Sequence, residues 1–248
     1  MAIIYQGKNH RKEAIENKRQ IRARKTKKAL IIFLISLIIS LIFLFYSFNT
    51  FFIISSMVIL IIIFALFISA YSSFVSPSDY FGELGEQKAL EILSQLDDTY
   101  TIFTNIDIYF KERISQVDNI IICRNGIFIV EVKNMRGHIK GNVTDEYLTQ
   151  EKVSKYGNRY TRDFYNPIKQ VGTHIYQLSN LLKSYNIYQY INGIILFVNE
   201  ESIIEVESDN IPVFHINNIE DLFDYIKTNT ITISKKEQNL IIEILLTM

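Results

Sequence analysis

The sequence predicts an α/β protein in which a mixed sheet flanked by helices follows two long apolar helices. Three observations support this fold class. The stretch from Ala29 to Ser78 contains no charged residue. The rest of the chain then alternates between helix-period and strand-period patterns of apolar residues. Near its centre, Asn125-Gly126 separates two runs rich in Ile and Val, which is a strong hairpin signal.

Charge is distributed unevenly along the 248 residues. The totals balance, with 26 Lys and Arg against 26 Asp and Glu. Met1 to Lys28 carries ten basic and two acidic residues, about +8, which leaves about −8 for the remainder. This asymmetry predicts a basic arm over residues 1–28 that contacts a membrane or nucleic acid. The single cysteine, Cys123, excludes a disulfide framework and a zinc site with several Cys ligands, and its mid-strand position favours buried packing.

The uncharged stretch predicts a hairpin of two transmembrane helices. A single helix of its length would reach about 75 Å, whereas the hydrocarbon core of a bilayer is about 30 Å thick. Residues 46–50 are the only mildly polar interruption, so the spans are expected at about 30–45 and 51–70 of a membrane segment at 29–71. A linker follows at 72–80. A buried pair of helices is the alternative, although apolar side chains cover every helix face.

The basic arm predicts an orientation. Because Lys and Arg adjoin the first span, the N-terminus is expected in the cytoplasm, and two spans return the chain to that side. The sequence therefore predicts a multi-pass protein of the cell membrane with both termini cytoplasmic. Its partners would include the lipid bilayer and, at the arm, anionic lipid. Nucleic acid is the alternative ligand of the arm.

The region at 81–248 is long enough for one domain with its own core. A helix is expected over about 82–96, where Ala89, Leu93 and Leu96 have helical spacing. Asn166-Pro167 predicts the start of another helix, since Asn caps helices and Pro is favoured at the first position. The other expected elements are strands at 100–106, 118–123, 127–133, 189–198 and 211–215, short strands between 138 and 161, and helices at 218–227 and 235–246.

The central hairpin gathers charged side chains. If Asn125 and Gly126 are the two turn residues, Asp118 lies opposite Lys133 and diagonal to Glu131, with backbones about 7–8 Å apart. The two carboxylates could then share one hard cation, and oxygen ligands suit Mg²⁺ or Mn²⁺. A plain cross-strand ion pair is the alternative. Two further polar residues lie on helix faces that carry apolar residues, Glu86 in the first helix and Gln170 one turn into the helix at Asn166-Pro167.

Together these residues resemble the NERD (nuclease-related) domain, which is assigned to the PD-(D/E)XK, restriction-endonuclease-like superfamily. The resemblance runs from about Phe81 to about Val198. It rests on five segments in order: Gly82-Glu83-Leu84-Gly85-Glu86, Gln116-Val117-Asp118, Gly126-Ile127-Phe128-Ile129-Val130-Glu131-Val132-Lys133-Asn134, Gly137-His138-Ile139-Lys140-Gly141 and Asn166-Pro167-Ile168-Lys169-Gln170.

The resemblance implies a catalytic role for each matching position. Asp118 and Glu131 would bind a divalent metal, Mg²⁺ or Mn²⁺, and Lys133 would orient water or stabilise charge on the phosphate. Glu86 would assist from the first helix, and Gln170 would lie near the substrate or metal. The chemistry implied is metal-assisted hydrolysis of a phosphodiester.

Nucleic-acid contact has support from charge as well. From Lys133 to Gln170 the chain has eight basic and four acidic residues, within an otherwise acidic domain, and four tyrosines lie among them. Basic groups would neutralise phosphates and tyrosines could stack on bases. A solvated loop surface is the alternative. The candidate contacts are Arg136, Lys140, Lys152, Lys155, Arg159 and Arg162.

Two functions remain open. The first is a membrane-anchored, divalent-metal-dependent nuclease that cleaves DNA or RNA at the cytoplasmic face. The second is a catalytically inactive scaffold with the nuclease fold. Asn119, where the family often has His, and the absence of Trp motivate the second. A transporter is disfavoured because the apolar stretch carries no ionisable residue. The sequence does not specify the oligomeric state.

Overall fold

The structure is a computed structural model that describes residues 1–7, 20, 24, 27–38, 42, 58, 61–65, 77–111, 113–154, 156–208 and 210–248. The chain divides into two compact units. The first unit comprises Met1–Asn9 together with Tyr80–Met248, and the second comprises His10–Asp79. The first unit holds both sheets and the candidate site.

The described residues include no helix that is both long and apolar enough to cross a bilayer. This finding overturns the predicted localisation at the cell membrane with two spans, and it gives no support to a lipid partner. An uncharged composition is necessary for a span but does not by itself specify a continuous helix of about 20 residues. Before Pro77, the helical residues that the structure describes are 20, 24, 27–38, 42, 58 and 61–65. Most of the predicted arm and the rest of both predicted spans lie outside the described residues.

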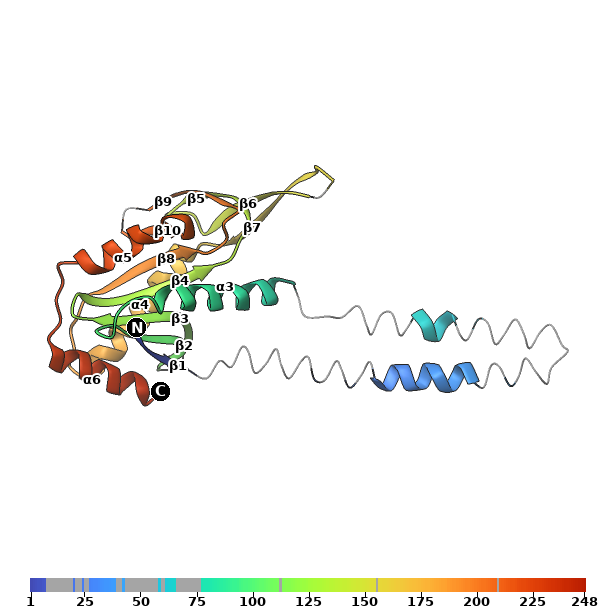
Figure 1. The fold of residues 1–248 in the computed structure, drawn as a ribbon, viewed down its shortest axis with the longest axis horizontal. Helices are drawn as coiled ribbons and strands as arrows, with labels where there is room; N and C mark the ends of the chain where they lie inside the picture. The colour runs from blue at the N-terminus through green and yellow to red at the C-terminus, as the bar shows by residue number, and fades with distance from the viewer. Residues whose placement is uncertain are drawn as a thin grey trace. The chain divides into compact units, whose positions relative to one another are not determined.

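A six-stranded sheet forms the centre of the first unit, in the order β1-β2-β3-β4-β8-β10 (Figure 1). The β2–β3 and β3–β4 pairs are antiparallel, whereas β1 with β2, β4 with β8 and β8 with β10 are parallel. The sheet is therefore mixed, as the sequence predicts. Its strands are β1 (Ile3–Gln6), β2 (Thr101–Phe110), β3 (Arg113–Cys123), β4 (Gly126–Lys133), β8 (Ile191–Phe197) and β10 (Val213–His215).

Helices cover both faces of this sheet and create two cores. One core joins α3 (Pro77–Leu93) and α5 (Ile219–Thr228) to the sheet face that carries Phe128 and Val130. The other joins α4 (Pro167–Ser184) and α6 (Lys235–Leu246) to the face that carries Ile127 and Ile129. Strand β4 is buried on both faces, which explains its almost continuous apolar sequence. A short 3₁₀ turn, Ile216–Asn218, precedes α5.

The predicted start of α4 is confirmed. The Asn166 side chain accepts a hydrogen bond from the Ile168 backbone N–H at 2.9 Å, and Pro167 occupies the first helical position. Asn166 also donates to the backbone carbonyls of Asn142 and Asp145. The cap therefore fixes the start of α4 against the segment that follows β5, which positions the first turn of the helix.

The turn between β3 and β4 lies one residue earlier than predicted, which shifts the pairing of the two strands by two residues. Cys123 pairs with Gly126, so Arg124 and Asn125 form the turn, and Asn119 pairs with Val130. Gly126 begins β4 with a φ of 129°, a conformation that favours glycine. Since side chains alternate with a period of two, an even shift preserves the faces of the paired residues, and Asp118 and Glu131 adjoin the last pair, Asn119 and Val130.

A second sheet follows β4 and has the order β7-β6-β5-β9. Its strands are β5 (Gly137–Asn142), β6 (Tyr147–Val153), β7 (Arg159–Tyr165) and β9 (Ser202–Glu207). The hairpin of β6 and β7 extends beyond the rest of the unit (Figure 1). The short strands expected between 138 and 161 are thus present as β5 and β6, together with the start of β7.

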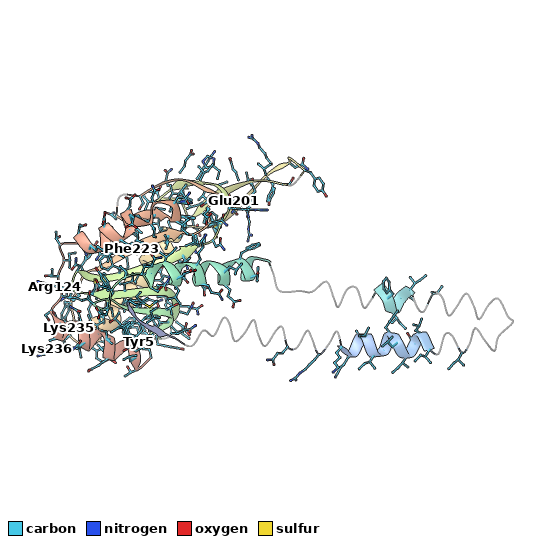
Figure 2. All side chains as sticks on the ribbon, in the orientation of Figure 1. Tyr5, Arg124, Glu201, Phe223, Lys235 and Lys236 are labelled. Atoms are coloured by element: carbon cyan, nitrogen blue, oxygen red, sulfur yellow. The ribbon has the colours of Figure 1, made fainter. Side chains whose placement is uncertain are left out.

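The structure contains two strands, β1 and β9, that the sequence did not predict. Strand β1 lies within the predicted basic arm, yet it pairs with β2, and the Tyr5 ring stacks on Phe103 with centroids 5.2 Å apart. Figure 2 shows Tyr5 on this strand at one edge of the sheet. Strand β9 pairs in parallel with β5. Both strands depend on partners distant in sequence, which local patterns do not reveal.

Candidate active site

Two carboxylates meet at the carboxyl end of β4. Asp118 of β3 and Glu131 of β4 lie on the sheet face that packs against α4, and Glu131 is 2% exposed. The backbone N–H of Val132 donates to Asp118 Oδ2 at 2.8 Å, which fixes the Asp118 carboxylate against β4. Strand β8 is parallel to β4, so the residues that follow both strands lie at the same end of the sheet. Figure 2 shows one of them, Glu201, at the end of the domain away from the β3–β4 turn at Arg124.

Lys133 joins this pair to α4. Its Nζ lies 2.6 Å from Glu131 Oε1 and donates to Gln170 Oε1 at 3.1 Å. Gln170 is in the first turn of α4, so the Asn166 cap also determines where its amide lies. The structure therefore brings together Asp118, Glu131, Lys133 and Gln170, four of the five predicted catalytic residues.

Glu86, the fifth predicted residue, approaches from the opposite helix layer on α3. The Asn134 side chain donates to the Phe81 carbonyl at 2.8 Å, which ties α3 to the end of β4. Gly85 allows this approach, because a Cβ there would lie 2.6 Å from Asn134 Cβ. Glu86 is partly buried, and its charge contributes to the raised pKa of Asp118.

The two carboxylates have opposite pKa shifts. Burial, followed by the charge of Glu131, raises the pKa of Asp118 to about 8. Burial also raises the pKa of Glu131, but the Lys133 charge and the contact with His174 outweigh it, so that pKa is lowered overall. Two buried acids beside each other resist double ionisation. The site therefore favours the ionised form of Glu131 and the protonated form of Asp118.

His174 and Ser115 complete the surroundings of Glu131, and neither was identified from the sequence. His174 Nε2 lies 3.4 Å from Glu131 Oε2, and His174 Nδ1 lies 2.5 Å from Ser115 Oγ. All three side chains are at least 90% buried. Gln170 and His174 are four residues apart on α4, so helical spacing from the predicted site residue Gln170 was the signal that could have revealed the histidine.

The donor set fits a small divalent cation. Glu131 Oε2 is buried without a hydrogen-bond partner of good geometry, and Asp118 is an acid whose ionisation requires compensation. The described residues contain no cluster of three or more His, Cys, Asp or Glu suited to a metal. Mg²⁺ commonly binds one or two carboxylates and completes its shell with water and substrate phosphate, so two carboxylates are compatible with it.

Strand register divides the six predicted nucleic-acid contacts. Lys152 is opposite Tyr160 and Gln150 is opposite Arg162, so these four side chains share one face of the β6–β7 hairpin. Arg159 is opposite Val153 on the other face. Lys140 is also on that other face, where its Nζ lies 3.3 Å from Glu151 Oε2. Lys155 lies outside the described residues.

Arg136 belongs with the first of these faces. Gln150 Nε2 donates to the Arg136 carbonyl at 2.8 Å. Burial lowers the pKa of Lys152, and the positive charges of Arg136 and Arg162 lower it further. Arg136 and Arg162 are thus each close enough to Lys152 to repel its charge.

Comparison with known proteins supports a nuclease-related domain. The family described as NERD, nuclease-related domain, matches residues 81–198, the region in which the sequence resembles it. An uncharacterized protein of Bacillus anthracis is 32% identical over 104 residues, which cover 41% of this chain and 47% of that protein. The chain therefore spans about half the length of this curated relative. No solved structure matches the chain. The match and the mixed α/β fold together identify residues 81–198 as similar to nuclease-related domains.

Proposed function

We propose that this protein is a divalent-metal-dependent nuclease that hydrolyses phosphodiester bonds in DNA or RNA. The observation that carries the proposal is the arrangement of Asp118, Glu131 and Lys133 at the end of β4, inside the region that matches the nuclease-related domain. A fold of the PD-(D/E)XK type belongs to the same proposal. The mixed sheet flanked by helices is consistent with it.

Asp118 and Glu131 would hold Mg²⁺ or Mn²⁺ between strands β3 and β4. When bound, such a cation polarises the scissile phosphoryl group and assists ionisation of the attacking water. The backbone N–H of Val132 and the His174 imidazole keep the two carboxylates in place. Both carboxylates stand on strands of a packed sheet, which is more rigid than a loop.

Lys133 is the group that can act on the substrate. Its side chain is 19% exposed, so the ammonium reaches solvent while Glu131 and Gln170 restrain it. An ammonium in this position can donate to a phosphate oxygen as charge accumulates in the transition state, or orient the attacking water. Gln170 restrains the lysine, and Glu86 adds a carboxylate from α3.

The test uses the full-length chain with labelled single- and double-stranded DNA and RNA, in Mg²⁺, Mn²⁺ or EDTA. Wild type is compared with Glu131→Gln and Lys133→Met. Lys169→Met is the matched control, because Lys169 adjoins Gln170 but its Nζ donates to the Thr144 carbonyl at 2.9 Å. Cleavage should require the metal and fall about 100-fold or more in both site variants, but not in the control.

Two results contradict the proposal. Cleavage that persists in EDTA, or that survives both Glu131→Gln and Lys133→Met, assigns the activity elsewhere. A folded wild-type chain that binds nucleic acid but cuts none of the four substrates identifies a non-catalytic binding protein. Circular dichroism of each variant establishes that it is folded.

A further inference from the structure

Lys152 and Arg162 share one face of the β6–β7 hairpin, and Arg136, just before β5, is tied to that hairpin through Gln150. Among the described residues, none of Arg136, Lys152 and Arg162 forms an ion pair, although their charges are close enough to lower the pKa of Lys152. Holding like charges together costs free energy unless an anion neutralises them. This face is therefore built for a negatively charged ligand.

The opposite face of the same sheet is neutralised internally. Lys140 pairs with Glu151, and His138 Nε2 lies 2.9 Å from Glu205 Oε2. Thr149 donates to Asp163 Oδ1 on that face as well. The acids that could balance the hairpin are thus placed by strand alternation on the face away from Arg136, Lys152 and Arg162.

The cationic face leads away from the candidate active site. Arg136 is three residues beyond Lys133 and is tied to β6 through Gln150. From there, Lys152 and Arg162 continue along the hairpin, which extends past the rest of the unit (Figure 1). Tyr160, 46% exposed, lies opposite Lys152 and offers an aromatic ring beside the charges. A row of charges with an adjacent ring suits a polyanion that carries stacked bases.

We propose that the hairpin face formed by Arg136, Lys152, Tyr160 and Arg162 binds the phosphate backbone of a nucleic-acid strand entering the active site. This inference rests on the proposed function for its substrate class. The three cations neutralise successive phosphates, and Tyr160 stacks on a base. Lys140 and Arg159, which the sequence alone groups with them, take no part because they lie on the other face.

The experiment measures binding without cleavage. Fluorescence anisotropy follows the full-length chain with labelled single-stranded DNA, double-stranded DNA and single-stranded RNA in EDTA, over a series of KCl concentrations. Arg162→Ala is compared with Arg159→Ala, which removes the same charge from the same strand on the opposite face. Lys152→Ala is compared with Lys140→Ala, which removes a lysine from the opposite face, on the neighbouring strand β5. Tyr160→Ala is compared with Tyr156→Ala, since Tyr156 lies in the hairpin loop and is 92% exposed.

Each phosphate contact contributes about 0.7 to 0.9 to the slope of log affinity against log salt. We expect Arg162→Ala and Lys152→Ala each to reduce that slope by about this amount, and their controls to leave it unchanged. Tyr160→Ala should weaken single-strand binding roughly tenfold while the slope stays the same. The relative affinities for the three probes show whether the bound nucleic acid is DNA or RNA, and whether it is single- or double-stranded.

Equal effects of Arg162→Ala and Arg159→Ala on the salt dependence of binding would overturn the proposal. Displacement of the labelled probe by polyglutamate at matched charge would also overturn it, because that result indicates an acidic protein as the ligand. If wild type cleaves in Mg²⁺ but the two arginine variants bind alike, this inference fails and the nuclease assignment stands. If Arg162→Ala weakens binding and Arg159→Ala does not, but no substrate is cleaved, the nuclease assignment fails instead.

Discussion

Each oxygen of the Glu131 carboxylate lies beside another side chain. Lys133 contacts Oε1 at 2.6 Å, and His174 contacts Oε2 at 3.4 Å. When the Ser115 hydroxyl donates to His174 Nδ1, the proton of the neutral imidazole is on Nε2 and faces Glu131. This order of groups resembles a Ser–His–acid relay, but Ser115 is buried and has no access to substrate. Its role is to orient the histidine.

We expect His174→Ala to reduce metal-dependent cleavage by about 10- to 100-fold, because partners that orient a metal-binding carboxylate have effects of this size. His174→Gln, which keeps an N–H group on this position of α4, should recover part of the loss. The readouts are the cleavage rate and the Mn²⁺ concentration at half-maximal rate.

Gln177→Ala is the control for His174, since Gln177 is also buried on α4 but its Oε1 has no hydrogen-bond partner. A His174→Ala protein with wild-type rate and wild-type Mn²⁺ dependence would show that the imidazole only fills space.

The sequence revealed some of the individual residues of the candidate site but not others. Asp118, Glu131 and Lys133 were identifiable because charged residues interrupt an apolar β pattern. Ser115 and His174 were not, since their contacts join β3, β4 and α4 across 59 and 43 residues of sequence. Only tertiary packing brings these side chains within reach of one another.

The contact between α3 and the end of β4 depends on one glycine. Gly85 Cα faces Asn134, and a methyl group there would lie 2.6 Å from Asn134 Cβ and 3.5 Å from Val198 Cγ2. Both neighbours belong to packed strand ends, so they have little room to move. The helix and the strand therefore approach only because position 85 lacks a side chain, and Glu86 follows directly.

Gly85→Ala should lower the free energy of unfolding by about 1–3 kcal/mol, the usual cost of overpacking, and should reduce cleavage by moving Glu86. Gly82→Ala is the control on the same helix, because a Cβ at Gly82 meets nothing within 4 Å. It should be neutral or stabilising by up to about 1 kcal/mol. Urea unfolding measures both, and equal stabilities of the two variants would contradict the close-packing argument.

In the β3–β4 hairpin, the error in the predicted turn left the predicted faces of the paired side chains unchanged. Moving the turn from Asn125-Gly126 to Arg124-Asn125 shifts the pairing by two residues, so each side chain keeps its face. An odd shift would have separated Asp118 from Glu131. Here the shift leaves Asp118 and Glu131 beside the last paired residues, Asn119 and Val130, where the Val132 N–H donates to Asp118.

The stability of the whole chain should depend on the proton that Asp118 carries. Folding raises its pKa from 3.8 to about 8, so the unfolded chain ionises first as pH rises. The free energy of unfolding is therefore expected to fall between about pH 4 and pH 8, and the full penalty applies above pH 8. The lowered pKa of Glu131 has the opposite effect: it stabilises the folded chain above pH 4.5, and this stabilisation is lost as the pH falls below that value.

Asp118→Asn removes this dependence. In EDTA the variant should match wild type near pH 5 and exceed it increasingly toward pH 9, by at most a few kcal/mol because Asp118 is only partly buried. Mg²⁺ should stabilise wild type but not the variant. Urea unfolding from pH 5 to pH 9 measures both effects, with the exposed Asp224→Asn as control. Parallel pH curves for wild type and Asp118→Asn would disprove the assignment.

The sequence by itself determined the class and order of most elements, the cap of α4 and the identity of the charged residues on β3 and β4. These features are local, because apolar periodicity and capping act within one or two turns of chain. Tertiary structure decided the register of the central hairpin, the positions of β1 and β9, the contact of His174 with Glu131 and the division of the basic residues between two faces. Each of these depends on pairing or docking between distant segments, whose free energy is shared over many contacts and leaves no local pattern in the chain.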